Sequence, residues 1–121
     1  MKRIRGAGNQ GPYSQSVICG DLIFTSGQIP VIPETGEILT GPVEAQAAQA
    51  LKNLQAVLRE AGSDLDRVVK AVVFLTDMAD YAAVNTVYQT AFGEHLPARS
   101  CVAVAALPRG VRVEVEAIAV L

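Results

Sequence analysis

Three residues near the C-terminal end of the chain have side chains that could do chemistry together. The stretch PARSCVAVAALPRGVRVEVEAIAV, residues 97–120, places Arg99 just before an apolar run, Cys101 at the start of that run and Glu114 among valines. The planar guanidinium of an arginine is suited to binding a small carboxylate through two hydrogen bonds. A carboxylate such as Glu114 can hold and deprotonate a water molecule. The stretch therefore offers an anion-binding group and an acid–base group.

Each of these residues also has an ordinary structural interpretation. Arg99 is compatible with a surface arginine at the start of a strand. Glu114 and Glu116 alternate with valines, so they share one face of a strand, and that face could simply be solvated. Cys101 is typical of a small buried apolar residue. A nucleophilic cysteine needs a base, and we place the one histidine, His95, at the end of a predicted helix, which argues against a Cys–His pair.

Four further residues are candidates for a binding site. Tyr13 follows a Gly-Pro pair, and Ser26 and Gly27 end a predicted strand. A glycine at the end of a strand permits another group to approach the backbone closely. Asn85 lies inside a predicted helix, where asparagine is mildly unfavourable, so we expect its side chain to have a partner, which could be purely structural.

Composition narrows the class of protein. Ten basic against twelve acidic residues give a net charge of −2, which provides no broad positive field and argues against nucleic acid as a partner. Half of the residues are apolar and the mean hydropathy is +0.31, more apolar character than one small core hides. We therefore expect a homo-oligomer. No apolar run approaches the roughly 18 residues of a membrane span.

Two cysteines without metal-ligand spacing predict free thiols and no metal site. No motif for an organic cofactor is found, so we expect no cofactor. The basic start, MKRIRGAGNQGPYSQ, lacks the apolar segment of a secretory signal and is expected to be a solvated end. A reducing, cytoplasmic location follows from these features.

The length predicts a single domain over residues 1–121. Hydrophobic periodicity predicts the order ββαβαββ, in which both helices cover one face of a mixed sheet to give an α+β sandwich. The other face, still apolar, is where we expect subunit contacts. The predicted elements are strands at Ser16–Cys19, Leu22–Ser26 and Asp66–Thr76, helices at about Val43–Ala61 and Asp80–Phe92, and a closing pair of strands joined by a tight turn within residues 97–120.

Taken together and in order, four motifs resemble the RidA family of reactive intermediate or imine deaminases, earlier described as perchloric-acid-soluble proteins and translation inhibitors. They are GPYSQ (11–15), FTSGQIP (24–30), VNTVY (84–88) and the PARS…E block, and the match runs from about residue 6 to the C-terminus. The resemblance implies a chorismate-mutase-like α+β fold. It also implies a homotrimer with ligand clefts between adjacent subunits.

The same resemblance implies a 2-iminobutanoate/2-iminopropanoate deaminase, which hydrolyses imines formed from enamines such as 2-aminoacrylate to 2-keto acids and ammonia. Arg99 would grip the substrate carboxylate and Glu114 would orient the attacking water. No metal or cofactor is implied. Endoribonuclease or translation-inhibitor activity, and non-catalytic binding of a small metabolite, are the alternatives. The other positions that the resemblance implies as substrate-binding are Tyr13, Ser26, Gly27, Asn85 and, mainly through its backbone, Cys101.

Overall fold

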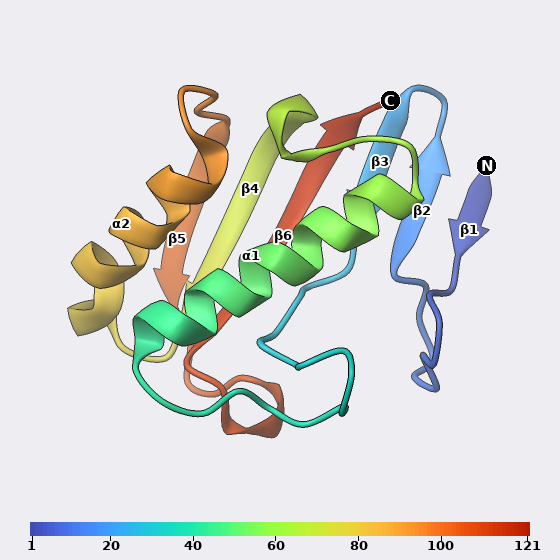
Figure 1. Cartoon of the computed structure of the whole chain (residues 1–121). Coiled ribbons are helices and arrows are strands. Elements are labelled where there is room, and N and C mark those ends of the chain that lie inside the picture. Colours follow the sequence, from blue (N-terminus) through green and yellow to red (C-terminus); the bar gives the residue numbers. More distant parts are fainter.

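Two helices lie against one face of a six-stranded mixed sheet (Figure 1). The structure is a computed structural model that describes residues 1–121. The strands are β1 (Lys2–Ile4), β2 (Ser16–Cys19), β3 (Leu22–Thr25), β4 (Val68–Leu75), β5 (Ala98–Ala103) and β6 (Val113–Val120), and the helices are α1 (Val43–Glu60) and α2 (Tyr81–Phe92). Three short 3-10 helices are η1 (Leu65–Arg67), η2 (Met78–Asp80) and η3 (Pro108–Gly110). The predicted α+β fold is confirmed.

The sheet order is β1-β2-β3-β6-β4-β5, which corrects the predicted hairpin at the C-terminal end. β5 and β6 are not neighbours, because β4 lies between them and pairs with both. β5 runs parallel to β4 at one edge of the sheet. A parallel pair needs a long crossover, and α2 supplies it. β6 then inserts between β3 and β4, so the chain between β5 and β6 is a connecting loop containing η3 rather than a tight turn.

The N-terminal residues also differ from the prediction. Lys2–Ile4 form the edge strand β1, which pairs antiparallel with β2, so the predicted order ββαβαββ lacks its first strand. Three residues with two basic side chains carry no strand pattern of their own. The neighbouring strand supplies the hydrogen bonds that order them.

Both helices bury the apolar stripe that predicted them. In α1, Ala47, Leu54 and Leu58 are buried against the sheet, and in α2, Val84 and Tyr88 are. α1 follows Pro42, whose fixed φ suits a helix start. No helix is long and apolar enough to cross a membrane.

No helix covers the other face of the sheet (Figure 1), and many of the residues on it are apolar. Along β6, buried residues under the helices alternate with half-buried residues on this open face, which include Glu114 and Glu116. The predicted sharing of a face by these two glutamates is confirmed. Phe24, on the same face, is 42% exposed. Other apolar residues there are Leu22, Phe74, Val102 and Ile118.

Candidate functional site

Arg99 lies on the edge strand β5, on the face of the sheet that the helices cover, because it pairs with the buried Ala71 of β4. Its guanidinium carbon is 4.7 Å from the ring centroid of Tyr88 and 5.5 Å from that of Tyr81. It also donates a hydrogen bond of 3.2 Å to the hydroxyl of Tyr81. Neither ion pair of the chain includes Arg99. A half-buried cation without an acidic partner is suited to binding an anionic ligand.

Cys101 lies two residues further along β5, on the same face as Arg99. It packs partly buried against the core. Burial raises the pKa of the Cys101 thiol, and the positive charge of Arg99 offsets this only in part. A thiol with a raised pKa is a poor nucleophile at neutral pH, which agrees with the argument against a Cys–His pair.

Asn85 lies on α2, four residues after Tyr81 and three before Tyr88, so it shares a helix face with both tyrosines. Its half-buried amide makes no side-chain hydrogen bond within the chain. The partner expected for Asn85 is therefore not a residue of the same chain. Because the side chain is only half buried, water or a bound ligand can satisfy it.

Glu114 lies on the open face of the sheet, opposite Phe74 of β4. Burial, and then the like charge of Glu116, raises the pKa of the Glu114 carboxyl above its usual 4.5. A carboxylate with a raised pKa accepts a proton more readily near neutral pH than an exposed one does. Glu114 therefore has the property that a general base needs.

Gly27 packs directly against the carboxylate of Glu114. A Cβ atom at Gly27 would lie 2.7 Å from Cδ of Glu114 and closer still to its Oε2. The backbone of Gln28 exchanges two hydrogen bonds with Val115, of 2.7 and 3.0 Å, and this holds Gly27 beside the glutamate. The group expected to approach the backbone at Gly27 is therefore the carboxylate of Glu114, and only glycine leaves room for it.

Ser26 and Tyr13 belong to two segments that are tied together. The hydroxyl of Ser26 donates to the carbonyl of Ser14 at 2.6 Å, and the side chain of Gln28 donates to that of Gln15 at 2.8 Å. Tyr13 is half exposed and, with Gly27, lines a cavity of about 670 Å³. These bonds join the GPYSQ and SGQIP motifs into one wall beside Glu114.

Arg99 and Glu114 are not brought together within one chain. Arg99 lies on the helix-covered face of the sheet, and Glu114 lies on the open face with β4 between their strands. Within the chain the candidate residues therefore form two separate groups, which we call the arginine half, on β5 and α2, and the glutamate half, on β6 and the two N-terminal motifs.

Sequence reasoning missed four polar residues of these halves. Gln15 and Gln28 stand inside the quoted motifs and could have been found there. Tyr81 and Tyr88 fall on the apolar stripe of α2, where aromatic residues are usually core, and they were interpreted as such. The signal that could have found them is the hydroxyl that each tyrosine adds to that stripe.

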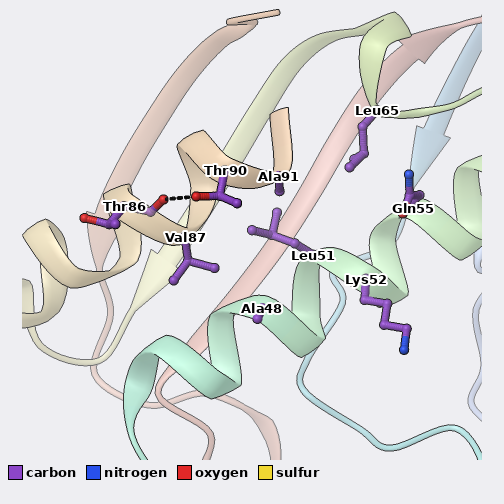
Figure 2. Close-up of a pocket in the computed structure, with 9 residues that line it drawn as sticks. All are labelled: Ala48, Leu51, Lys52, Gln55, Leu65, Thr86, Val87, Thr90 and Ala91. Carbon is purple, nitrogen blue, oxygen red and sulfur yellow. Dashed lines mark hydrogen bonds between the residues drawn. The ribbon is translucent and has the colours of Figure 1, made fainter. Parts of the chain in front are cut away.

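A groove of about 330 Å³ lies between α1 and α2, and Figure 2 shows the side chains that line it. Its wall includes Leu51 and Val87, and the hydroxyl of Thr90 is already bonded to the carbonyl of Thr86. It contains none of the predicted site residues. No group of three or more His, Cys, Asp or Glu side chains in the chain is placed to hold a metal ion.

A mixed six-stranded sheet with two helices, an arginine without an acidic partner and a glutamate of raised pKa defines a small α+β protein with a candidate binding site for an anion. The family model described as Endoribonuclease L-PSP matches residues 5–121. The 2-iminobutanoate/2-iminopropanoate deaminase of Escherichia coli (strain K12) is 51% identical over 113 residues, 91% of this chain and 88% of that protein. RutC family protein y4sK of Sinorhizobium fredii is 51% identical over 111 residues, 92% of this chain and 88% of that protein.

A solved structure agrees with the sequence matches. The crystal structure of E. coli TdcF with bound serine has a TM-score of 0.92 and 47% identity, covering 100% of this chain and 99% of that chain. The chain belongs to the Endoribonuclease L-PSP family, and the resemblance to the RidA family is confirmed.

Proposed function

We propose that this protein hydrolyses 2-imino acids, including 2-iminobutanoate and 2-iminopropanoate, to 2-keto acids and ammonia. The observation that carries the proposal is the guanidinium of Arg99, half buried against two tyrosine rings and without an acidic partner. A relative at 51% identity is named for this activity, and a related structure contains serine, which is also a small carboxylate.

The chemistry needs only the residues already described. Arg99 binds the substrate carboxylate, and Glu114 takes a proton from a water molecule as its oxygen adds to the carbon of the protonated imine. Glu114 then returns this proton to the nitrogen of the carbinolamine. The carbon–nitrogen bond breaks and ammonia leaves while the carbonyl forms; Glu114 takes the hydroxyl proton and passes it to the ammonia, which departs as ammonium. Because a protonated imine is already a good electrophile, orientation of substrate and water supplies most of the rate.

The remaining predicted residues have supporting roles in this proposal. The backbone of Cys101 binds next to Arg99, and Asn85 offers its free amide on the same side. Tyr13 and Ser26 border the glutamate half, and Gly27 gives the carboxylate of Glu114 its position.

The two halves of the site meet only if copies of the chain assemble. We propose a homotrimer in which Arg99 of one subunit faces Glu114 of the partner subunit across a cleft. Two features support this assembly: β5 leaves one edge of the sheet unpaired, and the open face exposes Phe24 and other apolar residues. Exposed apolar surface of this kind favours association.

The test is a coupled assay in which a serine or threonine dehydratase generates the imine and keto-acid formation is followed. Arg99→Ala is expected to abolish the acceleration while the mass of the particle stays unchanged. Unchanged activity in this variant would show that Arg99 does not bind the substrate carboxylate. Glu114→Ala is expected to lose activity but keep binding 2-keto acids. A non-catalytic binder would show no activity in the wild type.

Mixing the two variants tests the cleft between subunits. A trimer that contains both Arg99→Ala and Glu114→Ala chains has some clefts in which both native residues are present. Activity is therefore expected to return after the mixture is unfolded and refolded. If both residues acted within one chain, no mixture would regain activity.

RNA cleavage is the second candidate, because the matching family model is described as an endoribonuclease. The net charge of −2 opposes it. RNA binding whose affinity falls steeply with salt, together with cleavage that is retained in Arg99→Ala, would favour this candidate over imine hydrolysis.

A further inference from the structure

The hydroxyl of Tyr81 has a proton that the chain does not use. Tyr81 is the first residue of α2 and is 39% exposed. Its oxygen accepts the hydrogen bond from Arg99 at 3.2 Å. A phenol can accept and donate at the same time, and no acceptor within the chain takes the Tyr81 proton. An O–H donor therefore stands directly beside the unpaired guanidinium.

Tyr88 provides a contrast on the same helix. Its ring is nearer to the guanidinium, at 4.7 Å, and it is only 6% exposed. Its hydroxyl is buried without any hydrogen-bond partner. The ring of Phe92, 4.5 Å away, packs against it. Tyr88 therefore contacts Arg99 through its ring and not through its hydroxyl.

Interactions of the residues that precede Tyr81 fix its position. The carboxylate of Asp80, only 12% exposed, pairs with Arg112 at 2.8 Å and ties the start of α2 to the start of β6. Asp77 accepts a hydrogen bond from the backbone of Ala79 and so caps η2. These two interactions fix the segment just before α2, and so fix the position of Tyr81.

We propose that Tyr81 is a substrate-binding residue that shares the substrate carboxylate with Arg99. The Tyr81 oxygen accepts a hydrogen bond from the guanidinium, and its O–H donates to one carboxylate oxygen of the ligand. The ligand class, a small 2-oxo or 2-imino carboxylate, rests on the proposed function. Hydrogen bonds to a charged carboxylate are stronger than neutral ones, so Tyr81 contributes to affinity for the anionic ligand.

The test uses Tyr81→Phe with 2-oxobutanoate as the probe. Loss of one hydrogen bond to a carboxylate is expected to raise Kd by calorimetry, and KM in the coupled assay, by about tenfold. Because the bond is made equally in ground and transition states, kcat is expected to stay within about twofold. Tyr81→Phe keeps the ring, and its melting temperature checks that the fold is intact.

Two further variants make the result specific. Thr86→Val removes another hydroxyl of α2, one that bonds only to the carbonyl of Ala82, and is expected to leave Kd and KM unchanged. Tyr88→Phe removes the buried, unpartnered hydroxyl. If Tyr88→Phe raised Kd as much as Tyr81→Phe does, the effect would come from changing either tyrosine and not from the Tyr81 hydroxyl, and the inference would be overturned.

The outcomes also separate this inference from the proposed function. If wild type binds 2-oxobutanoate but does not hydrolyse imines, the function fails while the binding comparison still decides the role of Tyr81. If wild type hydrolyses imines and Tyr81→Phe has the wild-type Kd and KM, the inference fails alone. A wild-type protein that does not bind 2-oxobutanoate overturns it as well.

Discussion

Gly27→Ala is expected to disable the glutamate half of the site while leaving the fold intact. The added Cβ would lie 2.7 Å from Cδ of Glu114 and 3.1 Å from its Cγ, whereas ordinary contact begins at 3.4 Å. The atoms that it meets belong to the end of a flexible side chain rather than to backbone. The substitution therefore moves the carboxylate and not the sheet.

The size of the effect follows from this displacement. Relief of the clash requires the carboxylate to move by roughly 1 Å, and a misplacement of this size in a reacting group costs about a hundredfold in rate. Stability is expected to change little. The φ of Gly27 is not in the left-handed region, so alanine is compatible with the backbone. Its lower entropy in the unfolded state contributes about 0.4–1 kcal/mol in favour of folding.

The assay is the coupled measurement of kcat/KM together with a double-mutant cycle. Gly27→Ala alone is expected to lower kcat/KM about a hundredfold. In a Glu114→Ala background, the same change is expected to have no further effect, because the group that it displaces is gone. Additive losses in the double variant, or wild-type kcat/KM in Gly27→Ala, would refute the role of the Gly27–Glu114 contact.

Three further predictions concern stability. Because burial raises the pKa of Glu114, this group stabilises the fold below pH 4.5, and its contribution is lost as pH rises through the folded-state pKa. The melting temperature of Glu114→Gln should therefore be higher than that of wild type at neutral pH and equal to it in acid. Hydrogen bonds, the largest effect coming from Gln55, lower the pKa of the Asp64 carboxyl below its usual 3.8. Asp64→Ala should therefore lower the free energy of unfolding by about 1 kcal/mol at neutral pH, measured by urea titration, and by less as pH falls through the folded-state pKa. Arg112→Ala leaves the nearly buried carboxylate of Asp80 unpaired and should cost about 1–2 kcal/mol by the same measurement.

The helices and most strands could be predicted because their own side chains carry the pattern. α1 repeats apolar residues at three- and four-residue spacing, and β4 is a run of β-branched residues, so local sequence decides both. The pairing of β5 and β6 could not be predicted in the same way. The segment LPRG between two apolar runs is typical of a turn, and only the presence of β4 as a common partner separates the strands.

The candidate site residues could be named from the sequence, but their arrangement in the sheet could not. Motif resemblance placed Arg99 and Glu114 in one mechanism, and alternation within β6 placed Glu114 and Glu116 on one face. Whether Arg99 shares that face depends on the register of β5 against β4, which no local pattern specifies. Tyr81 was missed because an aromatic residue on a helix stripe is usually core.

The separation of Arg99 and Glu114 links assembly to chemistry. Glu114 lies on the open apolar face, beside Glu116 and opposite Phe74. In the proposed homotrimer this face is covered, and further loss of water would raise the pKa of Glu114 again, because burial already acts in that direction in the single chain. The positive charge of Arg99 acts in the opposite direction, because a nearby cation lowers the pKa of a carboxyl, so the pKa of Glu114 in the assembled cleft is set by both effects. A dissociated subunit would keep a Glu114 carboxyl of raised pKa but would lack the second half of the site.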